Sequence, residues 1–190
     1  MKRIGFLVVL VICLMLSGSA FAQGDNSVYF VTYYANNVSG APDATVRFIN
    51  DGDNGYLCAD FYVFDDSQEL QACGACYVSV DGLLSEDVKT ELTNNTVTGR
   101  VPSRGVIKVI SDFFCGNQDS PDPYPGLRGF ATHIERATPT SGAYATTETR
   151  VADSNLSSTE ETLLGNLCYY SGLLGSGQGT IACTTEDSDF

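Results

Sequence analysis

One stretch, residues 56–84, limits the fold of this chain more than any other. Its sequence is YLCADFYVFDDSQELQACGACYVSVDGLL. An apolar run rich in aromatic and β-branched residues (57–64) is followed by an acidic turn, and a second run then contains Cys73 and Cys76. Such runs around a turn are typical of antiparallel strands. We therefore expect a β-hairpin whose second strand is cross-linked, with the other segments packed around it.

The N-terminus has the three parts of a secretory signal peptide. Lys2 and Arg3 precede an apolar run, residues 4–16, and the motif AFA at 20–22 has the small residues of a cleavage site. The apolar run is shorter than the roughly 20 residues that a membrane-spanning helix needs. We expect residues 1–22 to be a signal peptide. The mature chain is then secreted (extracellular, cell-surface or periplasmic) and has no membrane insertion.

Cleavage would remove one of the seven cysteines and leave an even number. The six are Cys58, Cys73, Cys76, Cys115, Cys168 and Cys183. Six cysteines in an exported chain favour a disulfide framework, although they allow 15 pairings. All six are therefore disulfide candidates.

The preferred pair from sequence is Cys168–Cys183, because a glycine-rich link between them lets the chain fold back. Closing that loop would stabilise the fold by about 3 kcal/mol. Cys73 and Cys76 are rival partners for Cys168. A bond between those two, or from one of them to either remaining cysteine, stays open.

The chain is strongly acidic. The net charge is −13, and the two basic residues of the signal peptide contribute +2, so the mature chain carries −15. A phosphate backbone needs clustered lysine and arginine, so nucleic acid is excluded as a partner and an anionic membrane surface is disfavoured. Candidate partners are a cell-surface protein or a glycan.

Strand patterns recur along the mature chain. The predicted strands are 28–34, 44–50, 57–64, 96–101, 106–111, 127–136 and 144–152. The turn Asp51–Gly55 should join 44–50 to 57–64 as a hairpin. A second hairpin should join 127–136 to 144–152. Three prolines at alternate positions exclude residues 117–126 from a sheet interior.

Two helical segments are expected beside these strands. Ser158 to Glu161 has the capping-box pattern of a helix start. The residues expected on its apolar face are Leu163, Leu164, Leu167, Cys168 and Leu174. Residues 83–92 have roughly helical apolar spacing, and 179–183 could form a last short strand.

The fold class that follows is mainly β: an antiparallel β-sandwich of about seven or eight strands with one C-terminal helix. Residues 23–183 are expected to form a single domain, and 184–190 an acidic tail.

Several motifs together resemble a group of exported bacterial proteins of unassigned function. They are VYFVTYYANN, GAPDATVRFIND, YVFDDSQELQACGAC, RGVIKVIS, GLRGFATHI, ADSNLS and LGSGQG. The resemblance covers nearly all of the mature chain. It implies a bacterial, exported, single-domain protein and brings no catalytic or binding residues with it.

The pair Cys73 and Cys76 is open to three interpretations. A redox pair normally lies at a helix N-terminus in a βαβ context, whereas this one precedes a strand-like run. A metal site would recruit Cys168 and Cys183, whose separation does not match a zinc knuckle. We therefore favour structural disulfides and expect no cofactor and no metal ligand.

Other chemistry has weak support. Counted from Asp51, positions six and twelve are Tyr56 and Tyr62, where an EF-hand needs glycine and glutamate. A looser calcium site could use Asp65 and Asp66. His133 is the single histidine and lies within a strand pattern. The many acids supply carboxylate pairs for a glycosidase without specificity.

The aromatic strands are the last candidate. The residues that could stack on sugars or peptides are Tyr29, Tyr33, Tyr34, Tyr56, Tyr62 and Phe64. Buried strands have the same pattern, and burial is favoured. The function that follows is an exported, disulfide-stabilised β domain with a structural or binding role and no catalytic residues. The alternatives are a secreted carboxylate-dependent hydrolase and a thiol–disulfide redox protein that uses Cys73 and Cys76.

Overall fold

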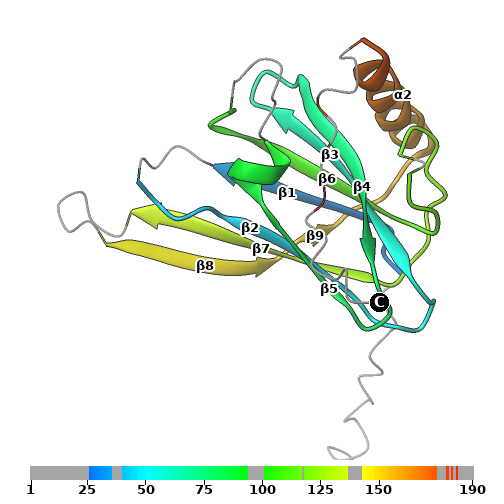
Figure 1. The fold of residues 1–190 in the computed structure, drawn as a ribbon, viewed down its shortest axis with the longest axis horizontal. Helices are drawn as coiled ribbons and strands as arrows, with labels where there is room; N and C mark the ends of the chain where they lie inside the picture. The colour runs from blue at the N-terminus through cyan, green and yellow to red at the C-terminus, as the bar shows by residue number, and fades with distance from the viewer. Residues whose placement is uncertain are drawn as a thin grey trace, which may run out of the picture.

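The computed structural model describes residues 26–35, 40–93, 101–116, 118–136, 143–174, 179, 181 and 183. Within these ranges the chain forms two antiparallel sheets that face each other, with one long helix on the outer side of the larger sheet (Figure 1). The predicted antiparallel β-sandwich with a C-terminal helix is confirmed. The signal peptide, the acidic tail and most of the predicted strand 96–101 lie outside the described residues.

The larger sheet has five strands. In spatial order they are β4 (Leu70–Val78), β3 (Leu57–Asp65), β6 (Arg104–Asp112), β1 (Tyr29–Ala35) and β9 (Ala152–Asp153). The predicted hairpin within 56–84 is confirmed as β3 and β4, which pair from Leu57↔Val78 to Phe64↔Leu70. β3 lies between two neighbours and is buried on both faces, so it is the central strand of the fold.

The smaller sheet has four strands. In spatial order they are β5 (Leu83–Asp87), β2 (Thr45–Asn50), β7 (Leu127–Arg136) and β8 (Tyr144–Arg150). β7 and β8 form the second predicted hairpin. The smaller sheet packs on the inner face of the larger one through aromatic rings, with Phe48 in edge contact with both Phe30 and Phe61.

The prediction that 44–50 and 57–64 form a hairpin is wrong. β2 pairs with β5 and β7, whereas β3 belongs to the opposite sheet. Residues 51–55 do turn, but they carry the chain from one sheet to the other. Asn50 holds this crossing, because its buried side chain donates to the carbonyls of Gly55 and Val78 and accepts from the Gly52 amide. A turn signal predicts a reversal of direction and not the partner of each strand.

The helical prediction for 83–92 is half right. Leu83–Asp87 is the strand β5, and Val88–Leu92 forms a short π-helical segment, η1. In β5 the side chains alternate, with Leu84 and Glu86 buried and Leu83 exposed. In residues 83–87, pairing with β2 outweighs the weak helical spacing of the apolar residues.

The long helix is α2 (Ser158–Leu174). Its N-cap is Ser157, whose hydroxyl accepts from the Glu160 amide, one residue earlier than the predicted Ser158. The predicted apolar face is only partly right: Leu164 and Cys168 are buried, but Leu163 and Leu174 are exposed. Gly165 lies at the closest approach, where a Cβ would stand 2.5 Å from the carbonyl oxygen of Asp119.

Alternation along β3 separates two cores. Leu57, Phe61 and Val63 point into the space between the sheets. On the other face Tyr62 joins a second apolar cluster with Leu164 of α2. Among the described residues, no helix has both the length and the apolar character needed to cross a bilayer.

Candidate functional site

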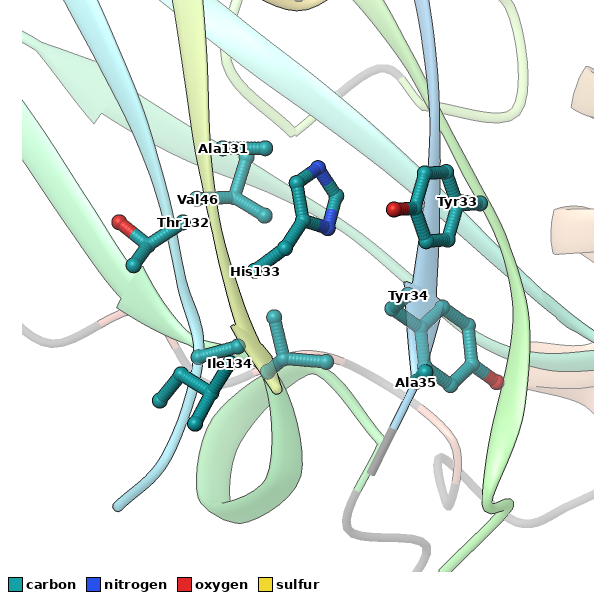
Figure 2. A pocket seen from close by; sticks show the side chains of 10 residues that line it. Tyr33, Tyr34, Ala35, Val46, Ala131, Thr132, His133 and Ile134 are labelled. Atoms are coloured by element: carbon teal, nitrogen blue, oxygen red, sulfur yellow. The ribbon is translucent and has the colours of Figure 1, made fainter. Parts of the chain in front are cut away.

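A small hollow lies between β1 of the larger sheet and β2 and β7 of the smaller one. Figure 2 shows His133 and Tyr33 next to each other among the residues that line it. Their rings stack, with centroids 4.3 Å apart and planes 11° apart. Its volume is about 40 Å³, which suits one or two waters but is small for a substrate. No carboxylate, cysteine or lysine is among the described residues that line it.

Five aromatic side chains gather at the end of the larger sheet where β3 begins and β6 ends. We call this set the aromatic ledge: Tyr56, Tyr77, Phe113, Phe114 and Tyr124. Tyr77 is 57% exposed and Phe114 is 51% exposed, and Tyr56 and Tyr124 are also exposed. Exposed apolar groups gathered in one place mark interaction surfaces, whereas single ones do not.

Three rings of the ledge are nearly parallel. The centroid of Tyr56 lies 5.6 Å from that of Tyr77 and 6.0 Å from that of Phe113, with interplanar angles of 29° and 23°. Phe114 stands almost perpendicular to Phe113, and Tyr124 is tilted against it. The ledge is therefore a row of three rings with two further rings at the Phe113 end.

Strand register and one disulfide position the ledge. Cys58 pairs with Tyr77 in β4 on one side and with Asp112 in β6 on the other. Tyr56 is the residue before β3 begins, and Phe113 is the residue after β6 ends. The Cys58–Cys115 disulfide then ties the loop after β6 back to β3. The rings consequently stand on a cross-linked strand end.

The stacking residues expected from sequence are divided by the fold. Tyr29, Tyr34 and Tyr62 are buried, as favoured, whereas Tyr33 and Tyr56 are exposed. Phe64 is half-buried, and the Lys108 ammonium lies over its ring, 5.0 Å from the centroid.

Four residues of the ledge were not among the predicted stacking residues: Tyr77, Phe113, Phe114 and Tyr124. A usable signal was present, because Phe113-Phe114 follows a strand and Tyr124 lies between prolines.

A buried acidic cluster lies beneath the loop that carries the ledge. Asp60 of β3 and Asp112 of β6 are both 0% exposed. They lie on the same face of adjacent strands, since Asp60 pairs with Ile110 and Cys58 with Asp112. Asp112 accepts the amides of Phe114 and Asp122, at 2.7 and 2.9 Å, whereas neither carboxyl oxygen of Asp60 has a hydrogen-bond partner.

The environment of Asp60 opposes its ionisation. Burial raises the pKa of Asp60 from 3.8 to about 9, and the charge of Asp112 and the hydrogen bond that a protonated Asp60 can donate to Asp112 add to the rise. Tyr62 responds in the same way: burial raises the pKa of its phenol, and the carboxylates of Asp60, Asp112, Asp119 and Glu161 add to the rise. The Tyr62 hydroxyl donates to the Gln118 carbonyl at 2.7 Å.

This pair does not form the cleft that the hydrolase alternative needs. Two catalytic carboxylates must reach a substrate, and both Asp60 and Asp112 are sealed from solvent.

The six cysteines form three disulfides. They are Cys58–Cys115, Cys73–Cys168 and Cys76–Cys183. The preferred pair Cys168–Cys183 is therefore wrong, while the rival partner Cys73 for Cys168 is right. Cys73 and Cys76 cannot bond to each other, because residues three apart in a strand point to opposite faces. Cys73 faces α2 and Cys76 faces the core between the sheets.

The redox interpretation fails on the same geometry. Cys73 and Cys76 are buried and each is bonded to a distant cysteine, so they do not form an exposed dithiol. Cys76 and Cys183 do lie near Glu86, in a group that would suit a metal ion. Their sulfurs are joined to each other, and a disulfide supplies no thiolate ligand.

The looser calcium site is not assembled either. Asp65 uses one carboxylate oxygen to accept the Ser67 and Glu69 amides, and the other accepts from Gln71. Asp66 pairs with Arg104 at 2.8 Å. These carboxylates shape the β3–β4 turn and do not converge with Asp51–Gly55.

Comparisons with protein-family models, with curated proteins and with solved structures found no match for the chain.

Proposed function

We propose that the chain is an exported bacterial module that binds neutral glycan chains on its aromatic ledge and has no catalytic role. The disulfide-stabilised β-sandwich suits an oxidising compartment. The signal-peptide pattern and the resemblance to exported bacterial proteins support export. The observation that carries the binding role is the row formed by the exposed rings of Tyr77 and Tyr56 and the half-buried ring of Phe113.

The chemistry of the ledge favours a carbohydrate. The apolar faces of sugar rings stack on flat aromatic rings, and tyrosine adds a hydroxyl that bonds to sugar hydroxyls. Tyr56, Tyr77 and Tyr124 supply three such hydroxyls at the surface. A row of nearly parallel rings suits a ligand that repeats along its length.

The charge of the protein narrows the ligand class. A mature chain with a net charge of −15 repels uronic acid and sulfated polymers. Acidic groups also flank the ledge, with Asp53 in the turn before Tyr56 and Asp122 before Tyr124. Neutral polysaccharides are the class of polysaccharide that the acidic protein does not repel.

A peptide strand is the less favoured ligand. Strand addition beside the ledge needs a free edge on β4, the edge strand that carries Tyr77. On β4, Cys73 already exchanges backbone hydrogen bonds with Gly179 and Ile181, at 2.8 and 2.9 Å. The C-terminal segment therefore occupies that edge near its middle, and the Cys76–Cys183 disulfide fastens it there.

Binding to a panel of neutral and acidic polysaccharides tests this function. We expect Tyr77→Ala to weaken binding of the selected neutral glycan by at least tenfold, since an aromatic side chain that contacts the ligand directly is worth about 2 kcal/mol. The measurement is affinity electrophoresis or calorimetry.

Tyr170→Ala is the matched control. Tyr170 is equally exposed (56%, against 57% for Tyr77) and also touches a second ring, Tyr169, but it lies on α2 away from the ledge. No binding of any neutral glycan, or equal loss in both variants, would refute the proposal.

A further inference from the structure

Asp60 stands out among the buried polar groups of the described chain. It is 0% exposed, and both of its carboxyl oxygens lack a hydrogen-bond donor. A buried acceptor without a partner costs about 1–3 kcal/mol, and more when it is charged. The buried carboxylates of Asp65 and Asp112, by contrast, accept backbone amides.

The neighbourhood of Asp60 has an excess of negative groups. Asp60, Asp112, Asp119 and Glu161 all act on the Tyr62 phenol, and none of the four forms an ion pair within the described part of the chain. Lys108 is on the same face of β6 but is bound to Glu160 at 2.5 Å. Among the described residues of this neighbourhood, the acids therefore outnumber the one cation, Lys108, whose ammonium is already paired.

A further unpartnered acceptor lies in the loop above. The side-chain oxygen of Gln118 is buried and has no donor, while its backbone carbonyl is already bonded to Tyr62. A water could donate to these acceptors, but it would leave two adjacent buried carboxyl groups without a counter-charge. A cation would bind the same oxygens and balance their charge.

We propose that Asp60 and Asp112 bind a divalent cation, Ca²⁺, beneath the loop that follows β6, with Gln118 as a further oxygen ligand. The candidate donors are all oxygens, as hard cations prefer, with no histidine or thiolate that would select zinc. Calcium fits better than magnesium, because magnesium keeps several waters and this site is sealed from solvent.

The cation would also brace the ledge. Asp112 receives the amides of Phe114 and Asp122, so it holds both ends of the loop that carries Phe114 and Tyr124. The proposal stands on the buried acceptors and is independent of the glycan function. A failure of either leaves the other intact.

Calcium binding to the chelator-treated mature protein is the test, with calorimetry for stoichiometry and thermal unfolding as a second readout. We expect one Ca²⁺ per chain, a higher unfolding temperature with Ca²⁺, and a smaller response to Mg²⁺. Asp60→Asn should lower Ca²⁺ affinity at least tenfold, because it removes the charge while keeping the shape.

Asp53→Asn is the control, since Asp53 is an exposed turn acid and the same unit of charge is removed. Circular dichroism shows whether each variant is folded. Gln118→Leu is a second test of the same site, and we expect it to lower the affinity for Ca²⁺. Absence of saturable Ca²⁺ binding by the folded wild-type protein overturns the proposal. So does equal affinity in Asp60→Asn and Asp53→Asn.

Discussion

At the scale of single residues, Asp60 shows how a side chain acquires its properties from its neighbours. In sequence it is one of 23 acids, placed in the strand run 57–64. In the fold it faces the outer side of the larger sheet, where the loop after β6 covers it and Asp112 lies beside it. Burial raises the pKa of Asp60 to about 9, so without a bound cation the native protein keeps a proton that the unfolded chain releases.

This retained proton predicts a pH dependence for the cation-free protein. The pKa of Asp60 is raised from 3.8 when unfolded to about 9 when folded. The contribution of Asp60 to the free energy of unfolding is therefore fully present below pH 4 and is lost as the pH rises toward 9. For one proton, the free energy of unfolding changes by up to about 1.4 kcal/mol per pH unit.

Asp60→Asn should remove that slope and stabilise the protein at pH 8. Urea unfolding in chelator at pH 5, 6, 7 and 8 measures the difference between the variant and the wild type. If the difference in unfolding free energy between the variant and the wild type does not change with pH, Asp60 is ionised in both the folded and the unfolded protein.

At the scale of elements, α2 and the loop before β7 form a close-fitting pair. The helix buries only a narrow line, Leu164, Gly165 and Cys168, and leaves Leu163 and Leu173 exposed. Gly165 permits the contact, because its missing side chain makes room for the Asp119 carbonyl. The helix start was predictable from local capping, whereas its buried line depended on where the loop lies.

Gly165→Ala should therefore destabilise the protein by about 1–2 kcal/mol. The new Cβ would be 2.5 Å from backbone, and such overpacking costs more than the better helix propensity of alanine returns. Gly172→Ala on the same helix meets nothing within 4 Å and should be neutral or stabilising by up to about 1 kcal/mol. Chemical denaturation compares the two; equal effects would mean that the loop does not rest on Gly165.

At the scale of the whole molecule, three disulfides connect segments that lie far apart in sequence. The bonded cysteines are separated by 57, 95 and 107 residues. Cys73–Cys168 fastens α2 to β4, and Cys76–Cys183 fastens the C-terminal segment to the same strand on its other face. β4 is thus the strand through which the helix and the end of the chain are held.

Replacing Cys73 and Cys168 together by alanine should lower the free energy of unfolding by about 2–5 kcal/mol, because a long loop in the unfolded chain is no longer closed. Non-reducing peptide mapping of the wild-type protein provides the direct check and should find the three bonds named above. A Cys168–Cys183 peptide would contradict this connectivity.

The features that depend on near neighbours were predictable from the sequence. Alternating apolar runs predicted most of the strands, the Asp65-Asp66 turn predicted the β3–β4 hairpin, and the hydroxyl–carboxylate pattern located α2 to within one residue. Three features depend on tertiary packing: β2 lies in the opposite sheet from β3, Cys168 bonds to Cys73, and the ledge rings form a row. Turns, caps and alternation arise from interactions a few residues long, whereas strand partners, disulfide partners and shared surfaces depend on segments brought together from across the chain.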